Sequence, residues 1–196
     1  MEQYQEKKFN LPEMNGLSKK QIDLHLGLYA GYIKNINILR AKINEYKEDS
    51  EKYALALSEL VRRLAFEWDG MRMHEYYFEA LGGSGNPGGS LIQELERQFG
   101  SFDAWLSEFR AIGMMRGAGW VTLARDPRTG ELLNTWVTDH EIGHLSGCDV
   151  LIAMDVWEHA YLIDYLPSER KTYIDIFMKN LKWEEVEKRF VGREKR

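Results

Sequence analysis

Residues 155–161 read DVWEHAY, which places the carboxylate of Asp155 and the imidazole of His159 four positions apart. The apolar run 150–154, VLIAM, precedes them and has the length and composition of a buried strand. If Asp155 ends that strand and His159 lies one turn further on, both can point at one metal ion. His25 and His74 stand far upstream, each in a segment of helical pattern. Three imidazoles and one carboxylate suit iron, manganese or zinc.

The N-terminal part of the chain predicts two long helices, over about 18–49 and 51–81. Ser18 is a natural N-cap for the first helix. The short connection between the helices predicts an antiparallel hairpin. The glycine-rich stretch that follows, GGSGNPGG, marks a domain boundary, so we expect domains over 1–83 and 84–196. The first helix carries apolar residues at helical spacing: Ile22, Leu26, Tyr29, Ile33, Ile36 and Leu39.

The C-terminal part mixes helical and β patterns. Strands are expected over 120–124 and 132–137, joined by a turn at 126–130 into a hairpin, with a third strand at 150–154. Two helices before the strands and two after them complete the domain. The predicted fold class is α+β, with an N-terminal antiparallel hairpin of long helices and a C-terminal domain in which helices flank a small three-stranded antiparallel sheet. The four expected C-terminal helices run over 90–98 and 101–115, and from about 173 and 184.

Composition excludes several classes of protein. The 196 residues carry a net charge of -5, which argues against a general nucleic-acid surface. A single cysteine, Cys148, rules out an internal disulfide. No apolar run reaches the roughly 18 residues that a membrane span needs. The charged start, MEQYQEKK, does not resemble a secretory signal, so the cytoplasm is the expected location.

DVWEHAY resembles the D-x-W-E-H-A signature of the iron/manganese superoxide dismutase family. Further segments resemble that family in the same order, and their order and spacing together make the resemblance specific. These segments are FNLP at 9–12, MHEYYF at 73–78, NPGG at 86–89, QFGSFD at 98–103, GAGW at 117–120 and the stretch 173–183.

The resemblance implies a function and a ligand set. The implied activity is the conversion of superoxide to dioxygen and hydrogen peroxide by one-electron cycling of one iron or manganese ion per chain. The implied ligands are His25, His74, Asp155 and His159, with solvent at a fifth position. Similar ligands bind both metals, so the ligand set does not choose between them.

The family usually holds that solvent with a glutamine, which comes from one of two places. One place is Gly70 here, which has no side chain to offer. The other matches His140, with His144 as the alternative. A histidine in this role favours iron, or the use of either metal.

Three more residues resemble family positions. Tyr32 matches a gateway tyrosine, Trp120 a wall of the pocket together with Trp157, and Arg170 an arginine that draws the anion inward. Ordinary helix packing for Tyr32 and a solvated surface charge for Arg170 are the alternatives.

Two positions depart from the family pattern. The family separates the first ligand and the gateway tyrosine by eight residues, with a histidine midway; His25 and Tyr32 are seven apart, and Tyr29 stands where that histidine would be. The tyrosine that bonds the midway histidine across a dimer interface is replaced by Leu162. Glu158 is retained. The resemblance therefore implies a homodimer, or a tetramer, in which Glu158 bonds His159 of the partner subunit.

Two other functions remain open. A metal-binding relative with little dismutase activity, used as a sensor or in a structural role, fits the altered first helix and the Gly70/His140 pair. A helical-hairpin interaction protein would bind no stoichiometric metal. A zinc hydrolase is disfavoured because His74-Glu75 lacks the second histidine of H-E-x-x-H.

Overall fold

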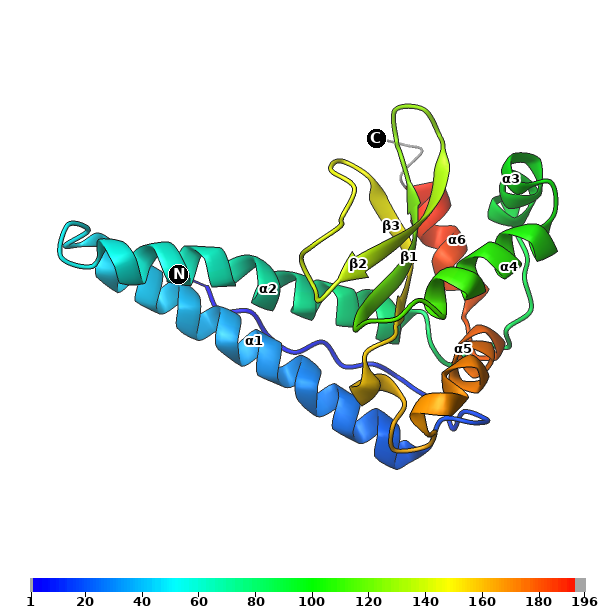
Figure 1. Cartoon of the computed structure of the whole chain (residues 1–196), viewed down its shortest axis with the longest axis horizontal. Helices are drawn as coiled ribbons and strands as arrows, with labels where there is room; N and C mark the ends of the chain where they lie inside the picture. Colours follow the sequence, from blue (N-terminus) through cyan, green and yellow to red (C-terminus); the bar gives the residue numbers. More distant parts are fainter. Residues whose placement is uncertain (1, 193–196) are drawn as a thin grey trace.

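The computed structural model describes residues 2–192, and a long helical hairpin forms its N-terminal half (Figure 1). Helix α1 (Lys19–Lys47) and helix α2 (Ala54–Glu79) run antiparallel. Ser18 caps α1 as expected, because its hydroxyl accepts a hydrogen bond from the backbone N–H of Gln21. The segment before α1 runs along the hairpin, where the Lys7 backbone N–H donates to the Tyr29 hydroxyl.

The C-terminal half holds a three-stranded antiparallel sheet with helices around it (Figure 1). The strand order is β2-β1-β3, so β1 is central. Short 3-10 turns at Glu158–Ala160 and Pro167–Glu169 follow β3. The remaining elements are α3 (Ser90–Phe99), α4 (Phe102–Gly113), β1 (Gly119–Arg125), β2 (Leu132–Thr138), β3 (Asp149–Asp155), α5 (Arg170–Lys179) and α6 (Trp183–Gly192).

The fold class predicted from the sequence is confirmed, and each predicted helix and strand is present. The largest shifts are at helix starts: α2 begins at Ala54 and α5 at Arg170, three residues from the expected positions. The 3-10 turn at Pro167 runs directly into α5, which moves its start forward. The domain boundary at residue 84 stays a prediction.

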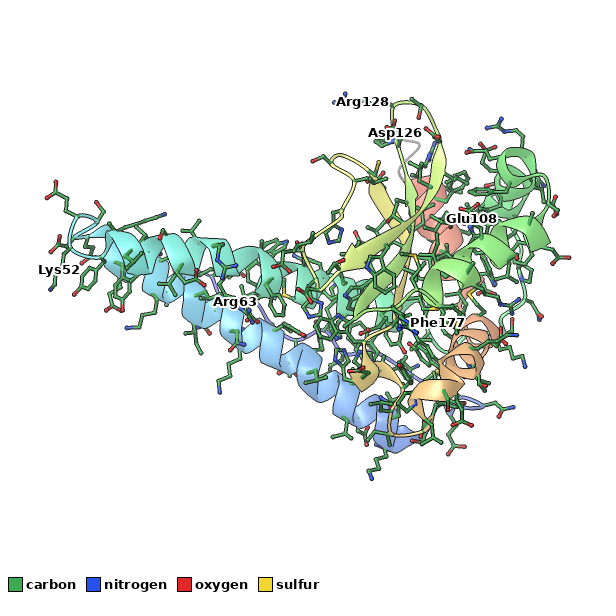
Figure 2. All side chains as sticks on the ribbon, viewed as in Figure 1. Lys52, Arg63, Glu108, Asp126, Arg128 and Phe177 are labelled. Carbon is green, nitrogen blue, oxygen red and sulfur yellow. The ribbon has the colours of Figure 1, made fainter. Side chains whose placement is uncertain are left out.

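The two halves meet where β3 packs against α2. Four large aromatic side chains at this junction are fully buried: Tyr77, Phe78, Trp120 and Tyr173. Figure 2 shows side chains filling the space between the hairpin and the sheet, whereas the far end of the hairpin, near Lys52, projects into solvent. Within residues 2–192, no helix combines the length and the apolar composition that a membrane crossing requires.

Candidate metal centre

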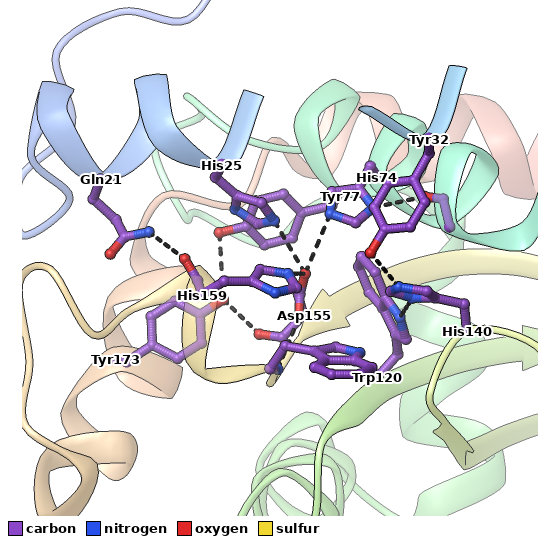
Figure 3. A network of polar contacts seen from close by, with 12 residues as sticks. Gln21, His25, Tyr32, His74, Tyr77, Trp120, His140, Asp155, His159 and Tyr173 are labelled. Atoms are coloured by element: carbon purple, nitrogen blue, oxygen red, sulfur yellow. Dashed lines mark hydrogen bonds and ion pairs between the residues drawn. The ribbon is translucent and has the colours of Figure 1, made fainter. Parts of the chain in front are cut away.

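Four potential ligands from three places in the chain converge between α1, α2 and β3 (Figure 3). His25 lies on α1, His74 on α2, Asp155 at the end of β3, and His159 in the 3-10 turn that follows. One ligand atom from each lies within 4.8 Å of all the others. The structure thus brings together the four residues that the sequence singled out.

Asp155 lies in the middle of the four potential ligands, and hydrogen bonds fix both its backbone and its side chain. Its carbonyl oxygen accepts a hydrogen bond of 2.6 Å from the Tyr173 hydroxyl, and its Oδ1 accepts one of 2.8 Å from the Trp157 backbone N–H. Oδ2 therefore faces the imidazoles, at 3.0 Å from Nε2 of both His25 and His159 and 3.7 Å from Nε2 of His74.

The imidazole of His74 has a fixed tautomer. Its Nδ1 lies 2.6 Å from the Gly70 carbonyl oxygen, which can only accept, so Nδ1 carries the proton. Nε2 then presents a lone pair to the site, and this buried atom has no hydrogen-bond partner in the described chain. A buried nitrogen without a partner is costly unless something binds it. The residues therefore fit a metal ion, and the Gly70 carbonyl supplies the outer hydrogen bond typical of ligand histidines.

Burial and nearby charges favour the metal-binding protonation states of His25, His74 and Asp155. Burial lowers the pKa of His25 and, with the nearby His25 ring, lowers that of His74 well below its usual value. Burial alone would raise the pKa of Asp155, but His159 and His25 outweigh it and hold that pKa well below the usual range. Burial opposes protonation of His159, but Asp155 raises its pKa overall. Neutral imidazoles and an ionised carboxylate are the forms that bind metal.

His140 lies beside the centre, fully buried, and joins it to Tyr32 (Figure 3). Its Nδ1 is 3.0 Å from the indole Nε1 of Trp120, and its Nε2 is 2.5 Å from the Tyr32 hydroxyl. Burial lowers the pKa of His140 to about 4, so the ring is neutral at pH 7. Because an indole N–H can only donate, Nδ1 accepts and Nε2–H donates to the Tyr32 oxygen. The Tyr32 hydroxyl keeps its own hydrogen for another partner.

The alternative residue, His144, has a different position. It is partly exposed, and its Nε2 lies 2.8 Å from the backbone carbonyl oxygen of His140. His140, not His144, is the one that meets Tyr32. Asp139 precedes it with φ at +53°, a left-handed conformation that turns the chain after β2.

Gly70 leaves the space that Tyr32 fills. A Cβ at this position would lie 2.5 Å from Tyr32 Cδ1 and 2.7 Å from Cε1, closer than atoms can approach. A glutamine from α2 and the present position of Tyr32 are therefore mutually exclusive. This explains physically why a polar residue next to Tyr32 has to come from the other half of the chain, as His140 does.

Helix α1 is a regular α-helix throughout. His25 and Tyr32 are seven residues apart, so they lie on the same side of this helix. The hydroxyl of Tyr29 bonds no residue of the centre. It donates to Glu75 Oε1 at 3.1 Å and accepts from the Lys7 backbone N–H, so this buried hydroxyl is fully hydrogen-bonded.

Aromatic rings enclose the centre. The Trp120 ring lies edge-on to His74 at 5.0 Å between centroids, and the Trp157 ring stacks on His159 at 5.6 Å. Arg170 lies elsewhere: its Nη1 donates to the Gly117 carbonyl oxygen at 3.0 Å, and its guanidinium is 5.9 Å from the Trp136 ring. The role expected for Arg170 stays a prediction.

Several supporting residues escaped the sequence analysis. Gln21 is fully buried and joins α1 to the turn that carries His159: its Nε2 donates to the His159 carbonyl at 2.6 Å, and its Oε1 accepts from Ile163 N–H at 3.0 Å. Its position four residues before His25, on the same helix face, is a signal that could have revealed it. Tyr77 shows no such signal, because its partner is Tyr173, 96 positions away.

Comparison with known proteins gives one consistent result. The family model described as iron/manganese superoxide dismutases, C-terminal domain, matches residues 87–189. A protein of Cupriavidus metallidurans named superoxide dismutase [Fe] is 36% identical over 184 residues, 92% of this chain and 91% of that protein. Proteins of the same name from Aquifex pyrophilus and Methanothermobacter thermautotrophicus are 33% and 32% identical, over 90% and 94% of this chain and 85% and 96% of their own lengths.

Proposed function

The chain belongs to the iron/manganese superoxide dismutase family, and on this basis we propose that it converts superoxide to dioxygen and hydrogen peroxide at the centre formed by His25, His74, Asp155 and His159. A bound iron or manganese ion would take an electron from one superoxide and give one to the next. The observation that carries the proposal is the buried convergence of four ligand atoms, one of which, His74 Nε2, has no hydrogen-bond partner in the described chain.

Proton supply is the role proposed for Tyr32 and His140, since peroxide formation consumes two protons. Burial raises the pKa of Tyr32, so its hydroxyl remains protonated at neutral pH. The hydrogen bond from His140 to the Tyr32 oxygen leaves the hydroxyl hydrogen free to orient a water molecule or the substrate. Trp120 fixes the His140 ring that makes this bond.

The enclosing rings would exclude bulk water from the site. Trp120, Trp157 and Phe78 surround the imidazoles and lower the local dielectric constant, which strengthens each hydrogen bond to the developing charge.

Iron is the metal we propose first. The three relatives compared above have iron in their names, and the residue that bonds Tyr32 is His140, where the family usually has a glutamine. Manganese alone, or activity with either metal, would correct this choice without changing the site. A cytoplasmic location stays a prediction.

A homodimer is the proposed assembly, with Glu158 bonding His159 of the partner subunit. In the single chain, Glu158 is exposed and the side chain of His159 is 23% exposed, although the other three ligands are fully buried. A shallow pocket surrounds the pair, and apolar residues line it: Leu24, Leu28, Leu162 and Ile163. An apolar face beside an incompletely covered ligand is what a second copy would bury.

The test is dismutation measured per bound metal ion, after separate reconstitution with iron and with manganese. Fast dismutation with iron supports the proposal in full. One bound metal per chain without dismutation would contradict it and favour a repurposed metal-binding relative.

A further inference from the structure

Superoxide is an anion, and this chain has a net charge of -5. An acidic protein that captures a small anion quickly needs a local positive field at the entrance to its site. Arg170 is the cation expected from resemblance, but its described contacts are with Gly117 and Trp136. A second positive charge lies near Tyr32 and His140.

Arg63 is such a charge. It lies on α2, and positions 63, 67, 70 and 74 recur at helical spacing, so Arg63 shares a helix face with Gly70 and the ligand His74. Figure 2 shows Arg63 on the hairpin, between the solvent-exposed end near Lys52 and the sheet.

A single aromatic ring separates Arg63 from the proposed proton donors. The Arg63 guanidinium carbon lies 3.8 Å from the centroid of the Phe66 ring. The Phe66 ring in turn lies 4.6 Å from the His140 ring and 6.2 Å from the Tyr32 ring. The guanidinium is thus stacked on Phe66, and Phe66 in turn contacts His140 and Tyr32 beside the centre.

A buried carboxylate fixes this guanidinium. Glu67 is 4% exposed, and its Oε1 accepts hydrogen bonds from Arg63 Nε at 3.0 Å and Nη2 at 2.9 Å. Its Oε2 accepts from Asn35 Nδ2 on α1 at 3.2 Å. The Arg63 side chain is 45% exposed, so the pair turns its negative end inward and its positive end to solvent.

The positive charge of Arg63 influences the pKa values of both His140 and Tyr32. Burial is the main cause that lowers the pKa of His140, and the positive charge of Arg63 adds to it. Burial, Asp155 and Glu67 raise the pKa of Tyr32, and the positive charge of Arg63 opposes them.

We propose that Arg63 is an anion-guiding residue, which draws superoxide to the entrance beside Tyr32, Phe66 and His140. This proposal rests on the proposed function, because it concerns the substrate of the same site. A single charge acting through solvent over several ångströms changes the local anion concentration by about twofold at low salt, and screening removes the effect at high salt.

The test compares Arg63→Gln with Arg97→Gln, a control that makes the same change in net charge. Arg97 is exposed on α3, a helix that supplies none of the four ligands, and it forms an ion pair with Glu94, three residues before it. We measure kcat/KM per bound metal ion from about 10 mM to 1 M ionic strength. Arg63→Gln should lower kcat/KM about twofold at low salt and match wild type at high salt. Arg97→Gln should match wild type throughout, and Arg63→Lys should retain the salt dependence.

Two results would overturn the proposal: equal behaviour of the Arg63→Gln and Arg97→Gln variants, or a deficit in Arg63→Gln that persists at high salt, which indicates a structural role.

An equilibrium binding measurement separates this proposal from the proposed function. Azide, a small monovalent anion, should bind metal-loaded Arg63→Gln about twofold more weakly than wild type at low salt. If the wild type binds metal and azide but does not dismutate superoxide, the proposed function fails while the azide comparison still decides the role of Arg63.

Discussion

His140 is locked as a neutral ring between an indole donor and a phenol, and this small network sets the chemistry proposed for Tyr32. The direction of each hydrogen bond follows from one fact, that the Trp120 N–H can only donate. Tyr32 is therefore the residue at which proton delivery can be tested without touching a ligand.

Tyr32→Phe should keep one metal ion per chain and lower turnover by about tenfold, the effect expected from losing one well-placed hydrogen-bond donor. Metal content and steady-state dismutation on the same sample check this. Tyr46→Phe, near the far end of the hairpin, is the control and should change neither. Loss of metal from Tyr32→Phe would show that Tyr32 supports the ligands instead.

His140 also makes stability depend on pH. As pH falls below the ordinary histidine pKa of 6.5, the unfolded chain binds a proton, but folded His140 does so only near pH 4. Between these values the unfolded state binds more protons, so the free energy of unfolding falls as pH falls. His140→Gln should lose this contribution and show a shallower fall between pH 6.5 and 4 in urea unfolding. An unchanged pH dependence would mean that the pKa of His140 is the same in the folded and the unfolded chain.

The ligands could be predicted from the sequence because their residue types and order are distinctive. Phe66 and Tyr77 could not, because aromatic residues at helical spacing usually serve packing alone. Their contribution depends on contacts with residues far away in the chain, which local patterns do not reveal.

At the scale of elements, α1 and α2 act together to position the centre. Each supplies one imidazole, and Tyr32 of α1 fits against Gly70 of α2. Because Tyr32 packs so closely against α2, position 70 has room only for glycine, although glycine in a helix interior normally weakens the helix.

Gly70→Ala should displace Tyr32, because the new Cβ would come within 2.7 Å of two ring carbons. We expect a loss of about 1–3 kcal/mol in unfolding free energy, as for other overpacked core positions, and a drop in turnover. Gly31→Ala on α1 meets no atom within 4 Å and should instead stabilise by up to about 1 kcal/mol. Equal effects of the two substitutions, measured by urea unfolding, would contradict the packing argument.

Helices and strands could be predicted well because their apolar periods are strong and their ends carry caps and glycines. Ser18 acts as the N-cap that the sequence indicates, and Ser101 caps α4 at the start of the range expected for that helix. How the third strand pairs with the hairpin was harder to predict from the sequence. Strand β3 pairs with β1 although a long connection separates them, and the register of this pair shifts between Leu123 and Ala124. The placement of α1, held partly by Gln21, likewise depends on distant contacts.

At the scale of the whole molecule, one side of the centre is incompletely covered. Leu24 is 51% exposed and Leu162 is 43% exposed beside the partly exposed His159. Leu162 stands where the family has a polar bridging tyrosine, and this apolar side chain suits burial against a second copy.

Leu24→Glu should therefore weaken the proposed dimer, because each interface would bury two added carboxylates. Sedimentation velocity over a range of protein concentrations should show a monomer fraction that wild type lacks. Leu55→Glu, at the far end of the hairpin, is the control and should leave the dimer intact. A monomeric wild type would refute the proposed assembly.

The central claim is that four residues, on α1, on α2, at the end of β3 and in the 3-10 turn that follows it, hold one metal ion. The most direct test is elemental analysis of wild type, His74→Ala and His144→Ala after identical reconstitution with iron. Our account predicts about one iron per chain in wild type and in His144→Ala, because His144 lies outside the centre, and almost none in His74→Ala. Full iron content in His74→Ala would contradict the ligand assignment.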